Sequence, residues 1–261
     1  MAKSRDLTHI LREWPYESGQ INVRLIEGED GEPKVQMRLD LGLLQMEAWG
    51  RPDGTRPEGY ESLLEYYEAD LEEANYEAAE DGDDALGPAE PDFTLTPEDC
   101  RKLREEAVQY YHRYIALLIL GQFMGVVRDT SRNLRMINLC ADFADSEEDR
   151  NILEQFRPYI TMMRARAVAS QMIADEEPKA ALFLIDRGLQ DLKAVYEEQD
   201  RAEEFNDAHE AQILRGMRDE LRKKLPASQR AELKQRLEEA IRNENYELAA
   251  ILRDELKMLR E

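Results

Sequence analysis

The sequence predicts a mainly α protein that carries a small N-terminal antiparallel β unit, which makes the fold α+β overall. Three observations support this prediction. Strict alternation of apolar and polar residues is confined to residues 21–41. From about residue 60 onward, apolar residues recur at helical spacing. Capping and breaking residues then divide this second part into several segments, which predicts a helical-repeat-like or bundle domain and a C-terminal antiparallel helical hairpin.

The N-terminal part, residues 1–80, begins with the β unit. Apolar residues of the first strand alternate from 21 to 25, and those of the second from 35 to 41, around the turn-forming stretch 28–33. Residues 43–49 predict a third strand. A helix follows over residues 60–79. The face of this helix that we expect to be buried is an apolar stripe of Leu63, Leu64, Tyr67, Leu71 and Tyr76.

An acidic linker rich in Gly and Pro is predicted at residues 81–95, and it marks the boundary between domains. The net charge of -22 is concentrated around it, because residues 61–100 hold 15 Asp or Glu and no Lys or Arg. The other residues carry only -7. We interpret the acidic stretch as a solvated helix face plus linker, with docking on a basic partner as the alternative. Nucleic acid is an unexpected partner for such a chain, since phosphate binding depends on clustered Lys and Arg.

The predicted helical domain spans residues 96–225. Thr96-Pro97 and Ser146 are helix-start signals, and Pro178 separates two further helices. Two stretches, 114–134 and 165–189, place small residues where antiparallel helices would cross. This arrangement is similar to the tetratricopeptide helix pair, although the copies lie about 55 residues apart rather than the usual 34. A plain helical bundle is the alternative.

The last predicted segment, residues 226–261, contains two short helices around a polar turn. Leu233, Leu237, Ala240 and Ile241 share one helical face, and Asn245 can cap the second helix. Tyr246, Ala249 and Ala250 predict a face that a neighbouring helix can approach closely. Leu248, Ile251, Leu252 and Leu259 predict a second apolar strip that the first helix cannot cover.

This segment resembles the UVR motif, which occurs in the helicase and nuclease subunits of bacterial excision repair and in Clp unfoldases and their adaptors. The resemblance rests on Leu237, Ala240, Tyr246, Glu247, Ala249-Ala250, Leu252-Arg253-Asp254 and Leu256. It implies a bacterial protein whose hairpin binds another protein or a second copy of itself. The expected protein-binding residues are Leu237, Ala240, Tyr246, Leu248, Ala249, Ala250, Ile251, Leu252, Arg253, Asp254, Leu256 and Leu259.

Compartment and membrane association follow from a few residues. Cys100 and Cys140 cannot form a disulfide framework, and the first residues do not resemble a secretory signal, so we expect a cytoplasmic protein. The longest apolar run, residues 114–127, is shorter than the roughly 20 residues that cross a bilayer, so we expect a buried core helix there and no membrane association.

The sequence contains no motif of spaced catalytic, cofactor-binding or metal-binding residues. We therefore expect no catalytic residues, no cofactor and no metal. Arg128, Arg132 and Arg135 share a helix face that we interpret as solvated, with phosphate binding as the alternative. The leading hypothesis is a non-enzymatic adaptor or scaffold that uses the hairpin and a helical-repeat surface. The alternatives are a DNA-repair accessory that recruits excision-repair subunits, a regulatory adaptor of a Clp-type unfoldase, and an unrecognised enzyme.

Overall fold

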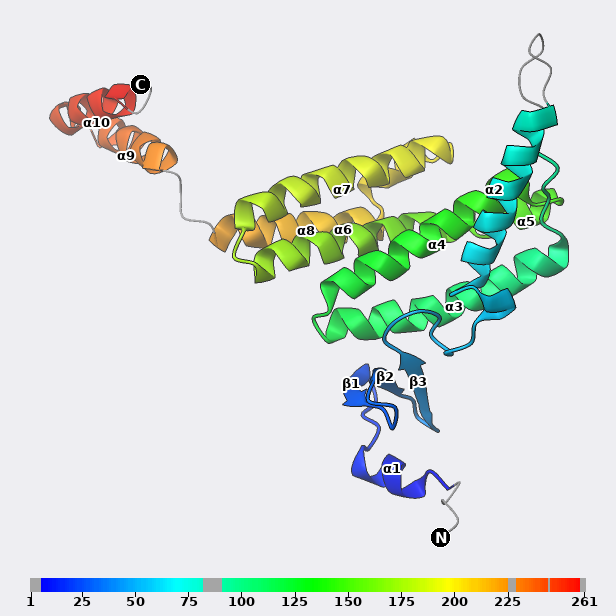
Figure 1. Cartoon of the computed structure of the whole chain (residues 1–261). Helices are drawn as coiled ribbons and strands as arrows, with labels where there is room; N and C mark the ends of the chain where they lie inside the picture. The colour runs from blue at the N-terminus through cyan, green and yellow to red at the C-terminus, as the bar shows by residue number, and fades with distance from the viewer. Residues whose placement is uncertain (1–5, 82–90, 225–228, 244, 259–261) are drawn as a thin grey trace. The chain divides into compact units, whose positions relative to one another are not determined.

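The computed structural model describes residues 6–81, 91–224, 229–243 and 245–258. The chain forms two compact units, residues 1–215 and residues 216–261, which we call the N-terminal unit and the C-terminal unit. The predicted fold class is confirmed, because helices dominate and a three-stranded antiparallel sheet lies near the N-terminus (Figure 1). The predicted linker falls largely on residues 82–90, outside the described residues, so that boundary stays a prediction.

The sheet follows the short helix α1 (Thr8–Glu13) and has the strand order β1-β2-β3. Its strands are β1 (Asn22–Glu27), β2 (Pro33–Arg38) and β3 (Leu43–Glu47). The third strand is therefore confirmed. Val35 and Met37 of β2 are buried as predicted, and Met46 pairs with Val35 from β3. The first strand forms as predicted, but its expected burial was wrong, since Ile21 and Leu25 are both exposed.

The opposite face of β2 is buried as well, and it is polar. Gln36 accepts a hydrogen bond from Arg24 of β1 at 2.7 Å and donates one to Gln45 of β3 at 2.8 Å. The Arg24 guanidinium also stacks on the Trp14 ring. Alternation of apolar and polar residues predicts that the polar face of β2 is exposed. It is buried instead, because hydrogen bonds across the strands satisfy its polar groups, whose burial would otherwise be costly.

The N-terminal unit continues with η1 (Pro57–Gly59) and α2 (Leu63–Asp81). Leu64 and Tyr67 belong to the main core, where they join buried side chains of the later helices. Tyr76 does not complete the predicted stripe, because it is exposed near the end of α2.

The remaining helices of this part pack pairwise, with α3 against α4, α4 against α6 and α6 against α7 (Figure 1). Thr96 caps α3 through a reciprocal capping box with Asp99, and Ser146 caps α5, as the sequence predicts. The helical elements are α3 (Pro97–Ile119), α4 (Phe123–Phe143), α5 (Glu147–Asn151), η2 (Glu154–Phe156), α6 (Arg157–Ala174), α7 (Pro178–Glu198), η3 (Ala202–Asn206) and α8 (His209–Lys224).

The apolar run 114–127 does not form the single core helix that its composition predicts. The turn at residues 120–122 divides it between α3 and α4. Gly121 in this turn has a φ of 71°, a left-handed conformation that glycine adopts without strain. No helix in the described ranges has both the length and the apolar character that a membrane crossing requires.

Small residues do allow close helix packing, as predicted. A Cβ atom added at Gly188 of α7 would lie 2.4 Å from the Cβ atom of Ala165 in α6. A Cβ atom added at Gly125 of α4 would lie 2.8 Å from Leu117 in α3. Both helix pairs therefore approach closely at positions that a larger side chain would separate. The likeness to a tetratricopeptide pair stays a prediction.

Buried charges join the sheet to the helices. Arg113 of α3 binds Asp129 of α4 and donates hydrogen bonds to the backbone carbonyls of Glu47 and Gly50, at 3.0 and 2.8 Å. The buried carboxylate of Glu106 pairs with Arg51 at 3.1 Å. The sheet and the helices thus share one interior within the N-terminal unit.

The predicted solvated arginine face is therefore wrong for one of its three members. Arg132 is buried, forms an ion pair with Glu106 and stacks on the Tyr110 ring. Arg128 donates to the Ala48 carbonyl, and Arg135 pairs with Glu68 near the surface. This set of arginines does not form a continuous exposed basic face.

Candidate functional site

The C-terminal unit contains a hairpin of two helices, α9 (Gln229–Arg242) and α10 (Tyr246–Met258), which pack against each other. The polar turn between them is held by its own hydrogen bonds. The Asn245 amide donates to the Ala240 carbonyl at 2.8 Å, and the Asn245 side chain accepts from the Leu248 amide at 3.2 Å. The predicted cap at Asn245 is confirmed.

The interior of the hairpin is small. Ala240 of α9 packs against Ala249 and Leu252 of α10, and the partly buried Leu237 completes the cluster. Two of the four side chains are alanines, which allows the helices to approach closely. Isolated helices of this length are marginal in water, so the packing of α9 against α10 is needed to keep them ordered.

The structure corrects which residues face inward. Leu252, predicted to lie on the second apolar strip, is 2% exposed inside the hairpin. Tyr246, predicted to lie on the inner face, is 70% exposed, and Ala250 is also exposed. Ala249 is buried, and Leu248 and Ile251 are exposed, as the sequence predicts. The predicted faces of α10 are therefore wrong only at Tyr246, Ala250 and Leu252.

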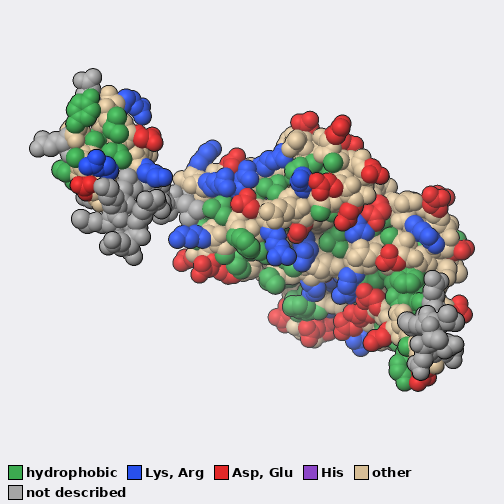
Figure 2. All heavy atoms as spheres, turned by 90° about the horizontal axis from the view of Figure 1, so that it is seen from above, with side chains coloured by type: hydrophobic (Ala, Val, Ile, Leu, Met, Phe, Trp, Pro, Cys, Tyr) green, Lys and Arg blue, Asp and Glu red, His purple; other side chains and the backbone are tan. Residues whose placement is uncertain are grey.

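Among the described side chains of the hairpin, three large aliphatic ones are exposed. They are Leu248, Ile251, which is 55% exposed, and Ile241 of α9. We call these three residues the outer strip. Figure 2 shows hydrophobic side chains at the surface of the C-terminal unit. Ile241 lies four residues after Leu237 and was therefore assigned to the same apolar face. In the structure Ile241 is exposed, whereas Leu237 is partly buried.

The remaining predicted residues of the hairpin are polar or lie outside the described side chains. Arg253 and Asp254 are exposed neighbours, with Nε and Oδ1 separated by 3.6 Å. An exposed pair of this kind contributes little to stability. The side chain of Leu256 and the whole of Leu259 lie outside the described part of the chain.

The N-terminal unit presents little reactive chemistry among its described residues. No group of three or more His, Cys, Asp or Glu side chains there, or elsewhere in the described ranges, could hold a metal ion. Cys100 and Cys140 are buried in the main core, and burial raises the pKa of both thiols, that of Cys140 to about 12. Protonated, buried thiols are poor nucleophiles.

The hairpin thus combines a buried cluster around Ala240 and Leu252 with an outer strip of exposed aliphatic side chains, a feature that is typical of interaction surfaces. The family model described as UvrB/uvrC motif matches residues 228–261, which include both helices of this hairpin. The predicted resemblance is thereby confirmed for the C-terminal segment. No curated protein and no solved structure matches the chain.

Proposed function

We propose that this chain is a non-enzymatic adaptor that binds a partner protein through the outer strip of its C-terminal hairpin. The exposure of Leu248 and Ile251, beside an interior that Ala249 and Leu252 already fill, is the observation that supports this proposal. Apolar side chains at helical spacing commonly enter a hydrophobic groove of a partner. The surface of the helical N-terminal unit serves in this proposal as the scaffold that carries the hairpin.

The match to the UvrB/uvrC motif supports a protein as the partner class. It also favours one more specific candidate, an accessory role in which the hairpin recruits subunits of bacterial excision repair. A Clp-type unfoldase and a second copy of the same chain remain alternatives from the sequence. In this proposal the protein acts in the cytoplasm.

The test compares variants of the full-length chain in affinity capture from a bacterial lysate, with candidate repair subunits and unfoldases identified among the captured proteins. Ile251→Asp introduces a carboxylate into the outer strip, where desolvation on binding would cost several kcal/mol. We expect capture of the specific partner to be lost while the hairpin stays folded. Gln235→Asp, at an exposed polar position of α9, is the matched control and should retain capture.

Circular dichroism and size-exclusion chromatography of the same variants complete the test. Undiminished capture by Ile251→Asp would contradict the role of the outer strip. A change of oligomeric state in Ile251→Asp, without loss of any other captured protein, would identify a second copy as the partner. Retention of the wild-type protein on duplex DNA at about 0.15 M salt would instead favour direct action on nucleic acid, which the net charge of -22 opposes.

A further inference from the structure

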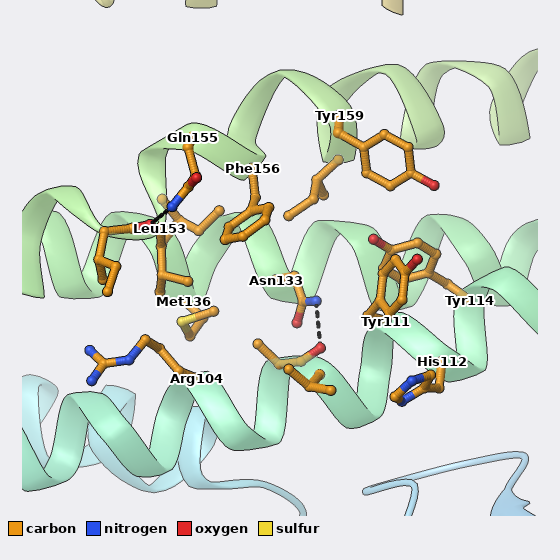
Figure 3. Close-up of a pocket in the computed structure, with 15 residues that line it drawn as sticks. Arg104, Tyr111, His112, Tyr114, Asn133, Met136, Leu153, Gln155, Phe156 and Tyr159 are labelled. Atoms are coloured by element: carbon orange, nitrogen blue, oxygen red, sulfur yellow. Dashed lines mark hydrogen bonds between the residues drawn. The ribbon is translucent and has the colours of Figure 1, made fainter. Parts of the chain in front are cut away.

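The N-terminal unit contains a pocket of about 670 Å³ that the proposed function does not use. It lies between α3, α4 and residues 152–160, the segment that leads through η2 into α6 (Figure 3). Its volume falls within the roughly 300–1,000 Å³ that small-molecule sites occupy. All of the residues that line it belong to the N-terminal unit and are described.

The pocket has an apolar floor and an apolar rim. Met136 and Leu153 are buried at the floor. Val108, which is 52% exposed, and Phe156 stand at the rim, where they contact solvent. Surface-exposed apolar side chains around a cavity of this size favour a ligand with an apolar body.

Three tyrosines gather at one end of the pocket. Tyr111 and Tyr114 extend from α3 toward the helix that carries Tyr159 (Figure 3), and the ring centroids of Tyr111 and Tyr114 are 5.4 Å apart. Tyr114 is only 1% exposed. No hydrogen bond joins any of the three hydroxyl groups to another described residue. This is unusual for Tyr114, which is buried, whereas Tyr159 is partly buried and Tyr111 is 41% exposed.

The other polar groups of the lining are already engaged. Asn133 donates to the Ala107 carbonyl at 3.1 Å, and Gln155 donates to the Ile152 carbonyl at 2.8 Å. Arg104 pairs with Asp149. The tyrosine hydroxyl groups are therefore the donors of the lining that can form hydrogen bonds to a ligand. Burial raises the pKa of Tyr114 and Tyr159, so both remain protonated donors at neutral pH.

The charge of the lining selects among possible ligands. Although the protein carries a net charge of -22, the pocket lining contains no Asp or Glu. Arg104 is the one Lys or Arg among its residues. A cationic ligand would find no counter-charge in the lining. A carboxylate would find several donors, since its two oxygens accept up to about four hydrogen bonds.

We propose that this pocket binds a small amphiphilic carboxylate, with its acyl or aryl body against Met136 and Phe156 and its oxygens at the hydroxyl groups of Tyr111, Tyr114 and Tyr159. All residues that line the site belong to the N-terminal unit, so this proposal does not rest on the hairpin. The chain would then bind a small molecule through its N-terminal unit in addition to the partner protein proposed for the outer strip.

The experiment is isothermal titration calorimetry of the full-length protein with three probes that share a ten-carbon chain: decanoate, decan-1-ol and decyltrimethylammonium. We expect decanoate to bind with one-to-one stoichiometry and more tightly than the other two. Tyr114→Phe removes one hydroxyl and keeps the ring, so it should raise the Kd for decanoate roughly tenfold, the loss expected for a hydrogen bond to a charged group.

Tyr110→Phe provides the matched control, since it makes the same chemical change on α3 at a residue that does not line the pocket. It should leave the Kd for decanoate unchanged. Val108→Trp fills the pocket from its exposed rim and should abolish binding, while thermal melting shows that the variant remains folded. Absence of decanoate binding, equal affinity for the cation, or an unchanged Kd in Tyr114→Phe would each overturn the proposal.

Discussion

The guanidinium group of Arg113 in α3 makes two parallel hydrogen bonds to the carboxylate of Asp129 in α4, from Nε to Oδ2 at 2.7 Å and from Nη2 to Oδ1 at 2.8 Å. Both side chains are almost completely buried. Removing one partner of such a buried ion pair costs more free energy of unfolding than the intact pair contributes to stability. The reason is that the remaining charge would lie uncompensated in the interior.

We therefore predict that Asp129→Ala destabilises the N-terminal unit by about 3–5 kcal/mol. Glu68→Gln serves as the control, since it removes an ion pair with Arg135 near the surface and should cost less than about 1 kcal/mol. Urea denaturation followed by circular dichroism measures both values. Equal losses in the free energy of unfolding would show that removing one partner of the buried pair costs no more than removing one partner of a surface pair.

The close contact between α6 and α7 predicts opposite effects at two helical glycines. Gly188→Ala places a methyl group against Ala165 and should destabilise the protein by about 1–3 kcal/mol. Gly216→Ala in α8 meets no atom within 4 Å and should stabilise it by up to about 1 kcal/mol. Thermal melting of the two variants compares them directly, and a Gly188→Ala protein as stable as the wild type would contradict the close approach of the two helices.

The orientation of α10 is tested by a pair of adjacent truncations. Leu252→Ala removes a buried side chain and should destabilise the hairpin by about 2–5 kcal/mol. Ile251→Ala removes an exposed side chain and should change hairpin stability by no more than about 0.5 kcal/mol. Amide hydrogen exchange in α10 reports each effect, and greater loss of protection in Ile251→Ala would reverse the assignment.

Asp149 gives a prediction about pH. Hydrogen bonding from Ser146, followed by that from Arg104, lowers the pKa of its carboxyl below the usual value of 3.8. A carboxyl group whose pKa is lower in the folded state stabilises the protein above about pH 4 and loses this contribution as the pH falls through the folded-state pKa. Asp149→Asn should therefore flatten the fall in the free energy of unfolding below about pH 4, measured by urea denaturation. An unchanged pH profile would exclude this contribution.

Local patterns in the sequence predicted those elements that depend on neighbouring residues. The capping box at Thr96, the cap at Asn245 and the breaker at Pro178 are all local signals, and each lies where it was expected. The UVR resemblance identified the hairpin because its alanines and leucines recur at fixed spacing within a short segment.

Contacts between distant residues could not be predicted in the same way. Arg113 and Asp129 lie on different helices, and neither is distinguished by its neighbours from the many exposed charges of the chain. Arg132 has a spacing typical of a solvated face, yet the carboxylate of Glu106 and the ring of Tyr110 draw it inward. Whether Leu252 and Tyr246 point toward α9 or toward solvent depends on the rotation of α10 about its own axis. Apolar spacing shows which residues share a face but does not determine this rotation.

The backbone carbonyls of Glu47 and Gly50 have their hydrogen-bond donor in Arg113, more than sixty residues further along the chain. This arrangement sets a lower limit on the part of the protein that can be produced alone. A fragment that started after residue 60 would leave the guanidinium of Arg113 without two of its acceptors and the carboxylate of Glu106 without Arg51. We therefore expect the helices to lose stability when the residues before 60 are removed, and deletion mapping of partner binding should keep these residues in place.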